Sequence, residues 1–102
     1  MLCRIKLGKR QEWLDWCSLL MTVYLEEARE TLGEENLINE MCLVFGAGDD
    51  SFVVYRHETQ SGKKKPANME RELNKKHFDK FHECLEIIDP CVEGYSVLAK
   101  ER

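Results

Sequence analysis

The sequence is short of the features that would assign it to several large classes of protein. It has no apolar run close to the ~20 residues that a membrane-spanning helix needs, and Arg4 and Lys6 interrupt the stretch that a signal peptide would keep apolar. It has no excess of positive charge, since its net charge is −4 and its pI about 5.4. Nucleic acids and anionic membranes attract clustered positive charge, so this balance argues against both as partners.

Cysteine is present, but not in a pattern that indicates disulfides. The chain has five cysteines, an odd number, and no C-x-x-C pair. Together with the missing signal segment, this set predicts a soluble, cytoplasmic protein with free thiols. Free cysteine is among the most buried residue types, so we expect these side chains to be small core residues. The five are Cys3, Cys17, Cys42, Cys84 and Cys91.

Motifs for phosphates, metals, nucleophiles and RNA are also missing. The chain contains neither G-x-x-x-x-G-K-[ST] nor G-x-G-x-x-G, and no nucleophile elbow. His77 and His82 lie five residues apart in a predicted helix and therefore point about 140° apart, which prevents them from chelating one ion. The stretch DDSFVVYRH lacks the glycine-aromatic signature of RNA-recognition domains. The sequence predicts no metal site and no cofactor.

The composition fits a single globular domain over residues 1–102. Apolar residues make up 43% of the chain and charged residues 33%, which suits a folded rather than a disordered protein. A chain of this size buries only about two thirds of its unfolded surface. Association with a second copy would therefore add apolar burial that the monomer lacks.

The apolar periodicity predicts the order strand, helix, strand, strand, helix, strand. Period-two alternation indicates the strands, and apolar positions three and four apart indicate the helices. The predicted ranges are 2–7, about 9–32, 36–45, 51–58, 66–88 and 93–100, with a hairpin loop over 46–50. This order predicts an α+β domain of the ferredoxin-like βαββαβ type with an antiparallel sheet.

The first predicted helix carries two sets of apolar residues. One broad stripe, which includes Trp13 and Leu20, would cover the sheet, whereas Trp16, Leu19 and Val23 form a flank of their own. A surface helix normally has a single apolar stripe. The flank either packs deeply beside a neighbouring helix or meets a partner subunit or a pocket, and its three residues are our candidates for an interface.

The two hairpin strands are apolar on both faces. Met41, Leu43 and Phe45 alternate with Cys42 and Val44, and the second strand is similar. A ferredoxin-like sheet has helices on one face only, and its open face is usually polar. Two sheets packed face to face would cover the additional apolar surface, so the sequence predicts a homodimer in the form of a dimeric α/β barrel.

Three stretches carry a resemblance to a known superfamily: CRIKLGKRQEWLDW, LINEMCLVFGAGDDSFVVYRHE and HFDKFHECLE. On these, the chain resembles the dimeric α+β barrel proteins, which include antibiotic-biosynthesis-type monooxygenases. More narrowly, it resembles a small bacterial family of this length that has no established activity. The resemblance covers nearly the whole chain and implies a site in the cleft between sheet and helices, but it supplies no residue with a known role.

Two polar residues on one strand face are the candidates for catalysis. Tyr55 and His57 alternate on the second hairpin strand, where histidine could act as a general base and tyrosine could orient a substrate oxygen. The alternative interpretation is a sheet edge that faces solvent. His77 lies within the apolar stripe of the second helix, where a core histidine is the alternative to a ligand-binding one. The candidates for lining a pocket are Trp13, Arg4, Glu40 and His77.

These observations leave two functional hypotheses. The first is a homodimer that binds a small organic ligand or regulates another process. The second is a cofactor-independent enzyme of the monooxygenase or isomerase sort that uses the cleft. A buried titratable group beside a closed apolar pocket would favour the enzyme.

Overall fold

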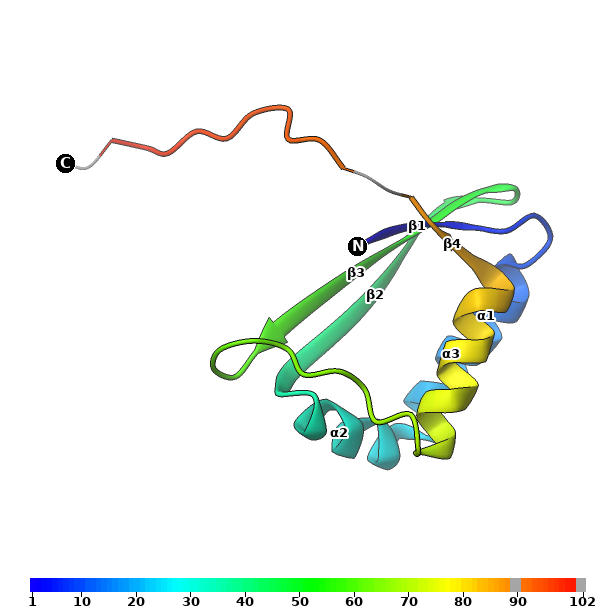
Figure 1. Ribbon diagram of the computed structural model, residues 1–102. Coiled ribbons are helices and arrows are strands. Elements are labelled where there is room, and N and C mark those ends of the chain that lie inside the picture. The colour runs from blue at the N-terminus through cyan, green and yellow to red at the C-terminus, as the bar shows by residue number, and fades with distance from the viewer. Residues whose placement is uncertain (89–90, 101–102) are drawn as a thin grey trace.

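The computed structural model describes residues 1–88 and 91–100 and shows an α+β fold. Within those residues there are three helices and a four-stranded antiparallel sheet (Figure 1). The elements are β1 (Leu2–Ile5), α1 (Arg10–Met21), α2 (Leu25–Glu34), β2 (Leu37–Ala47), β3 (Asp50–Thr59), α3 (Glu72–Cys84) and β4 (Leu85–Ile87). None of these helices is long and apolar enough to cross a membrane.

The strands of the sheet lie in the order β2-β3-β1-β4, each antiparallel to its neighbours. The β2–β3 hairpin depends on Gly46, whose φ of +82° is in the left-handed region. A Cβ at this position would lie 1.8 Å from the carbonyl oxygen of Asp50, so only glycine fits. The predicted hairpin is therefore present, with Phe45 opposite Phe52 and Gly46 opposite Ser51.

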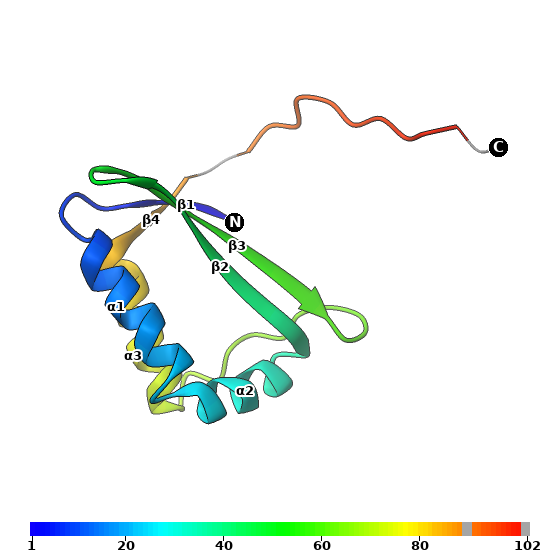
Figure 2. The same cartoon turned by 180° about the vertical axis from the view of Figure 1, so that it is seen from behind.

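The three helices cover one face of the sheet. Figures 1 and 2 show α1 and α3 side by side, while α2 lies across their far end and approaches β2. The core fills the space between the sheet and the α1–α3 pair. Its buried members are Cys3, Ile5, Trp13, Trp16, Val53, Tyr55, Leu73, Cys84 and Leu85.

The single helix predicted over residues 9–32 is two helices, and this prediction was wrong. The chain turns at residues 22–24, where Thr22 donates its hydroxyl hydrogen bond to the Ser18 carbonyl at 2.7 Å. Side-chain bonds of this kind and β-branched residues both weaken a helix. The turn brings Tyr24 against Trp16, with ring centroids 5.9 Å apart.

This turn also corrects the proposed interface flank. Trp16 is only 5% exposed and belongs to the core, whereas Leu19 and Val23 are 41% and 70% exposed. The three residues therefore do not share one surface. Trp16 packs in the core, as the alternative interpretation of the flank expected, and only Leu19 and Val23 lie on the surface.

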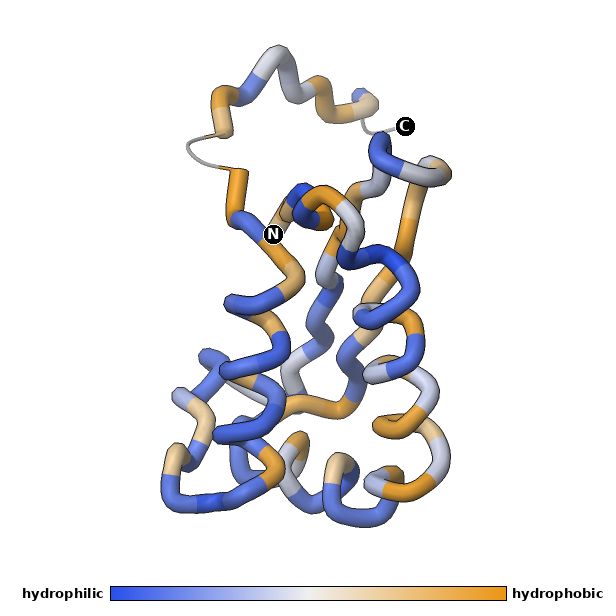
Figure 3. Tube along the Cα trace, turned by 90° about the vertical axis from the view of Figure 1, so that its right-hand side faces the viewer, coloured by the Kyte–Doolittle hydropathy of each residue, from blue (hydrophilic) through white to orange (hydrophobic). Residues whose placement is uncertain are grey.

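The predicted end of the chain is also wrong. The helix expected over 66–88 begins at Glu72 and ends at Cys84, and the last strand is Leu85–Ile87 rather than 93–100. Because β4 pairs with β1 through Leu85 and Ile5, that edge of β1 has no room for another strand. Residues 91–100 extend away from the domain, and hydrophobic and hydrophilic stretches follow one another along them (Figures 1 and 3).

The second face of the sheet carries no helix among the described residues, and it has an apolar patch beside the charged residues Arg4, Arg56 and Glu86. The strand register places Leu2 beside Val54, Val54 beside Leu43, and Phe52 beside Phe45 on this face. Leu2, Leu43 and Phe45 are 40–53% exposed. The two-sided apolar character of the hairpin is thus a real property of the folded chain. We call the open sheet face the surface formed by Leu2, Met41, Leu43, Phe45, Phe52 and Val54.

Candidate functional site

Two adjoining cavities lie between the helix-covered face of the sheet and the helices. Their volumes are about 290 and 390 Å³. The first is bounded by α2, α3 and the segment before α3, and the second by α1, α2 and β2. Both are walled mostly by apolar side chains, and both are lined by Leu20, Ala28, Glu40 and His77.

His77 is the central polar group of these cavities. Its Nδ1 accepts a hydrogen bond of 2.9 Å from Nε1–H of Trp16. Because the indole nitrogen is a donor only, the neutral imidazole must carry its proton on Nε2. Burial lowers the pKa of His77, and the nearby carboxylate of Glu40 opposes this only in part. His77 is therefore neutral at physiological pH and offers an N–H donor on its Nε2 side.

Tyr55 continues this arrangement. Its hydroxyl oxygen lies 3.5 Å from Nε2 of His77, a long contact in which the imidazole N–H faces the phenol. Burial raises the pKa of Tyr55, and the negative charge of Cys42 and Glu40 adds to the shift, so the phenol stays protonated. Trp16, His77 and Tyr55 thus form a chain of contacts from α1 through α3 to β3.

Glu40 and His57 form a second polar pair near the cavities. The Nε2 atom of His57 lies 3.0 Å from Oε1 of Glu40, and both side chains are about one third exposed. The ring of His57 also stacks on Tyr55, at 6.2 Å between centroids. The alternation that placed Tyr55 and His57 on one face is therefore present in the fold, with Tyr55 buried and His57 at the exposed edge.

The two remaining candidates from the sequence, Trp13 and Arg4, lie on different faces of the sheet. Trp13 is fully buried and packs against His77, at 6.1 Å between ring centroids. Arg4 is on the other face of the sheet, with its guanidinium 5.6 Å from the centre of the Phe52 ring. Strand side chains alternate between faces, so Arg4 points away from its neighbours Cys3 and Ile5 in the core. Arg4 does not belong to the cavity.

Sequence reasoning missed a pair of thiols in the second cavity, Cys17 of α1 and Cys42 of β2. A hydrogen bond from the Cys17 thiol lowers the pKa of Cys42 to about 7; burial opposes the shift, and donors on Trp13 and Tyr55 support it. The same thiol contact and burial raise the pKa of Cys17. Both residues were on the inward faces expected from periodicity, but periodicity does not tell which inward residues meet.

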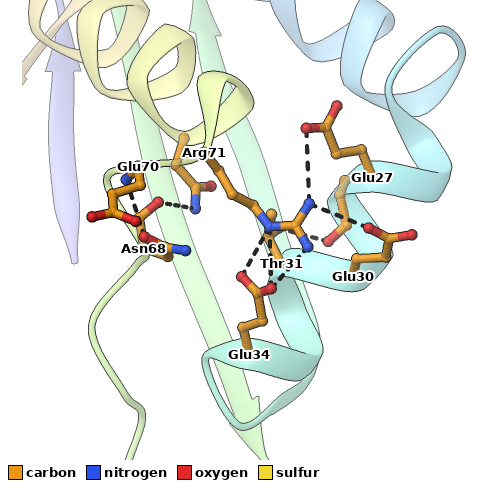
Figure 4. Close-up of polar contacts among 9 residues, drawn as sticks. Glu27, Glu30, Thr31, Glu34, Asn68, Glu70 and Arg71 are labelled. Carbon is orange, nitrogen blue, oxygen red and sulfur yellow. Dashed lines mark hydrogen bonds and ion pairs between the residues drawn. The ribbon is translucent and has the colours of Figure 1, made fainter.

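Sequence reasoning also missed the contact that positions α2 as a wall of the cavities. Figure 4 shows Arg71, just before α3, reaching the carboxylates of α2. It donates to Glu34 at 2.8–3.2 Å and to Glu30 at 3.2 Å, and its guanidinium lies 3.9 Å from Glu27. The acidic residues lie three, four and seven positions apart, which places them on one helix face. These contacts lower the pKa of Glu34 and hold the two helices together.

No group of three or more His, Cys, Asp or Glu side chains suited to a metal ion occurs among the residues that the structure describes. Comparison with protein-family models, with curated proteins and with solved structures finds no significant match to this chain. The function is therefore argued from the geometry of the cavities.

Proposed function

We propose that this protein is a homodimer that binds a small organic molecule between its sheet and its helices. The supporting observation is a pair of adjoining apolar cavities on which His77, Tyr55 and Glu40 converge. Ligand sites are typically apolar cavities of ~300–1,000 Å³ with a few well-placed polar groups. Volumes of about 290 and 390 Å³ lie at the small end of that range.

The polar groups define the class of ligand. The Nε2–H of His77 and the hydroxyl of Tyr55 are donors that suit a carbonyl or hydroxyl oxygen. The carboxylate of Glu40 lines both cavities and repels an anion. We therefore propose an uncharged, mainly apolar molecule with one carbonyl or hydroxyl group, such as an aromatic ketone or alcohol, in preference to the matching acid.

A thermal-shift screen with matched ligands tests this proposal. Each aromatic alcohol or ketone is compared with the carboxylic acid of the same skeleton. A ligand at about ten times its Kd stabilises a protein by about 1.4 kcal/mol, which raises the Tm of a chain this size by several degrees. We expect the neutral member of each pair to give the larger shift. The acid giving the larger shift, or no ligand giving any, would contradict the proposal.

Two variants locate the site. His77→Ala and Tyr55→Phe should each weaken the binding of the ligand that gives the largest shift, because each removes a hydrogen-bond donor from the cavity. Asp79→Ala is the matched control, since Asp79 is exposed on α3 and lines neither cavity. Equal losses for all three variants would place the ligand elsewhere.

A second copy of the chain is proposed to cover the open sheet face. The monomer exposes 7897 Å², whereas a compact monomer of 12.0 kDa exposes about 6,000 Å². The excess of about 1,900 Å² per chain is more than twice the ~800 Å² that each partner buries in a standard interface. Exposed apolar residues lie on the open sheet face and along residues 91–100, where Val92, Tyr95, Val97 and Leu98 are 80–92% exposed.

The proposed assembly packs the two open sheet faces against each other as a dimeric barrel. The antiparallel order β2-β3-β1-β4 supports assignment of each subunit to the ferredoxin-like βαββαβ class. The alternation of residues 93–100, which finds no strand partner within its own domain, suits a strand added to the other copy.

Light scattering on charge-insertion variants tests the dimer. Phe45→Asp on the open sheet face should yield a monomer, because it buries a carboxylate in the apolar contact. Val23→Asp is the matched control on the helix side, where Val23 is 70% exposed. A monomeric parent protein would refute the dimer, and dissociation by Val23→Asp alone would move the interface to α1.

The neutral state of His77 favours a second candidate, a cofactor-independent enzyme of the isomerase sort. With Nδ1 occupied by Trp16, His77 is a donor at Nε2 and not a base. Glu40 would take a proton from the carbon next to a carbonyl, oriented by His57 at 3.0 Å. His77 and Tyr55 would stabilise the oxygen that gains negative charge. The same arrangement would serve a cofactor-independent monooxygenase, whose first step is also loss of a carbon-bound proton.

Hydrogen exchange separates binding from catalysis. A bound ketone in D₂O should exchange its α-proton for deuterium, observed by NMR, and Glu40→Gln should abolish exchange while binding persists. A ketone that binds but does not exchange its α-proton would contradict the enzyme and support a function in binding alone.

A further inference from the structure

We infer that Cys42 reduces small hydroperoxides that enter the second cavity and that Cys17 resolves the oxidised form as a disulfide. This inference needs only a route for a peroxide to the cavity. It does not rest on the binding of the organic ligand proposed above. The two cysteines come from different elements, β2 and α1, and both line the same cavity.

Donor groups of Cys17, Trp13 and Tyr55 lie near the Cys42 sulfur. Cys42 lies directly opposite Tyr55 in the β2–β3 register, on the helix-covered side, where cross-strand side chains are neighbours. The Nε1–H of Trp13 is buried and has no full hydrogen-bond partner among the described residues. A buried orphan donor costs about 1–3 kcal/mol, and a negatively charged sulfur at Cys42 is the acceptor that would satisfy it. The Cys17 thiol is the third donor.

These donors explain why Cys42 differs from the other thiols of the chain. Its pKa is lowered to about 7, so about half of it is thiolate near neutral pH, against a few per cent of a free cysteine. Burial and the charge of Glu40 on β2 oppose the shift. The cavity is also lined by Arg29 of α2, by Tyr55 of β3, whose phenol stays protonated, and by His77 of α3, which is neutral. Cys84 has the opposite setting, because burial and its bond to Glu12 at 3.2 Å raise its pKa to about 12.

The proposed reaction balances in two steps. The Cys42 thiolate attacks one peroxide oxygen, the O–O bond breaks, and the leaving alkoxide or hydroxide takes a proton from solvent. The sulfur loses two electrons, the peroxide gains them, and Cys42 becomes a sulfenic acid. Cys17 then attacks that sulfur, the S–O bond breaks, and the hydroxyl group leaves as water with the Cys17 proton. Two molecules of a small thiol then reduce the Cys17–Cys42 disulfide by exchange, through a mixed disulfide, and leave as a disulfide of their own.

Mass spectrometry of the whole chain tests this sequence. The parent is Cys91→Ser, which removes an exposed thiol. Hydrogen peroxide and tert-butyl hydroperoxide are each added, with dimedone present to trap sulfenic acid. We expect the parent to lose two hydrogens and yield a peptide that joins Cys17 to Cys42. In Cys17→Ser, dimedone should label Cys42 instead, and Cys42→Ala should give neither product.

Unmodified protein supplies a test that does not depend on how the variants fold. Cys42 should be oxidised about threefold or more faster than Cys91 at neutral pH, and Cys84 should stay reduced. The oxidation rate should rise with pH to a midpoint near pH 7. Oxidation of Cys42 no faster than that of Cys91, a midpoint near that of a free thiol, or sulfenic acid without a disulfide in the parent would each overturn the inference.

Discussion

The burial of His77 predicts how the stability of this protein depends on pH. Because burial lowers the pKa of His77 in the folded state, the unfolded chain binds the proton more readily. The unfolding free energy must then fall as the pH drops below the ordinary histidine value of about 6.5. The stability contributed by neutral His77 is fully present above that pH. It is lost progressively as the pH falls from that value to the lower pKa of the folded state.

The size of the effect follows from linkage. Lowering the pH from about 7 to about 5.5 costs at most about 1.2 kcal/mol, the free energy that the unfolded chain gains by protonating an ordinary histidine over that window. That loss lowers the Tm of a domain this size by roughly 5–10 °C. The pKa values of Glu12 and Glu34 are also lowered in the fold. Their stabilising contributions are lost only below the ordinary carboxyl range of about 4.3, outside this window.

Urea unfolding of the native protein and of His77→Gln over this window is the assay. The glutamine keeps an oxygen that can accept from Trp16 but cannot titrate, so the pH dependence should fall to the smaller part that Cys42, with its pKa lowered to about 7, contributes in this window. His82→Gln is the matched control, because His82 is exposed on the same helix. An unchanged slope in His77→Gln, or an equal loss of slope in His82→Gln, would refute the reasoning.

Four further substitutions test the fold around the site. Gly46→Ala should lower the unfolding free energy by more than ~1 kcal/mol because its Cβ would strike backbone, whereas Gly33→Ala, in open space on α2, should raise it by up to ~1 kcal/mol; urea unfolding measures both. Trp16→Phe should cost about 1–3 kcal/mol in the same assay, because it leaves the Nδ1 acceptor of His77 without its donor; an unchanged unfolding midpoint would contradict this. Arg71→Gln should speed amide hydrogen exchange in α2, and high salt should speed the same exchange in the native protein. Exchange in α2 that neither the substitution nor the salt changes would mean that the ion pairs do not hold that helix.

Local sequence patterns were enough to predict the orientation of most side chains. The hairpin and its two apolar faces follow from period-two alternation, and the inward direction of His77 follows from helical spacing. The sequence left open whether Tyr55 points into the interior or lies at a sheet edge that faces solvent. The positions of element ends were less well predicted. The break at residues 22–24 brings Tyr24 against Trp16, a contact that the single helix predicted over 9–32 did not include.

The sequence by itself determined which faces of this chain are apolar and therefore where an interior and an unpartnered surface must lie. Only the tertiary structure decided which inward residues meet. It brought Cys17 to Cys42, placed Arg71 beside three glutamates of α2, and put Leu85–Ile87 rather than 93–100 beside β1. The physical reason is that periodicity fixes the direction of a side chain relative to its own element. Partners come instead from the packing of elements distant in the chain, where one strand edge accepts only one neighbour.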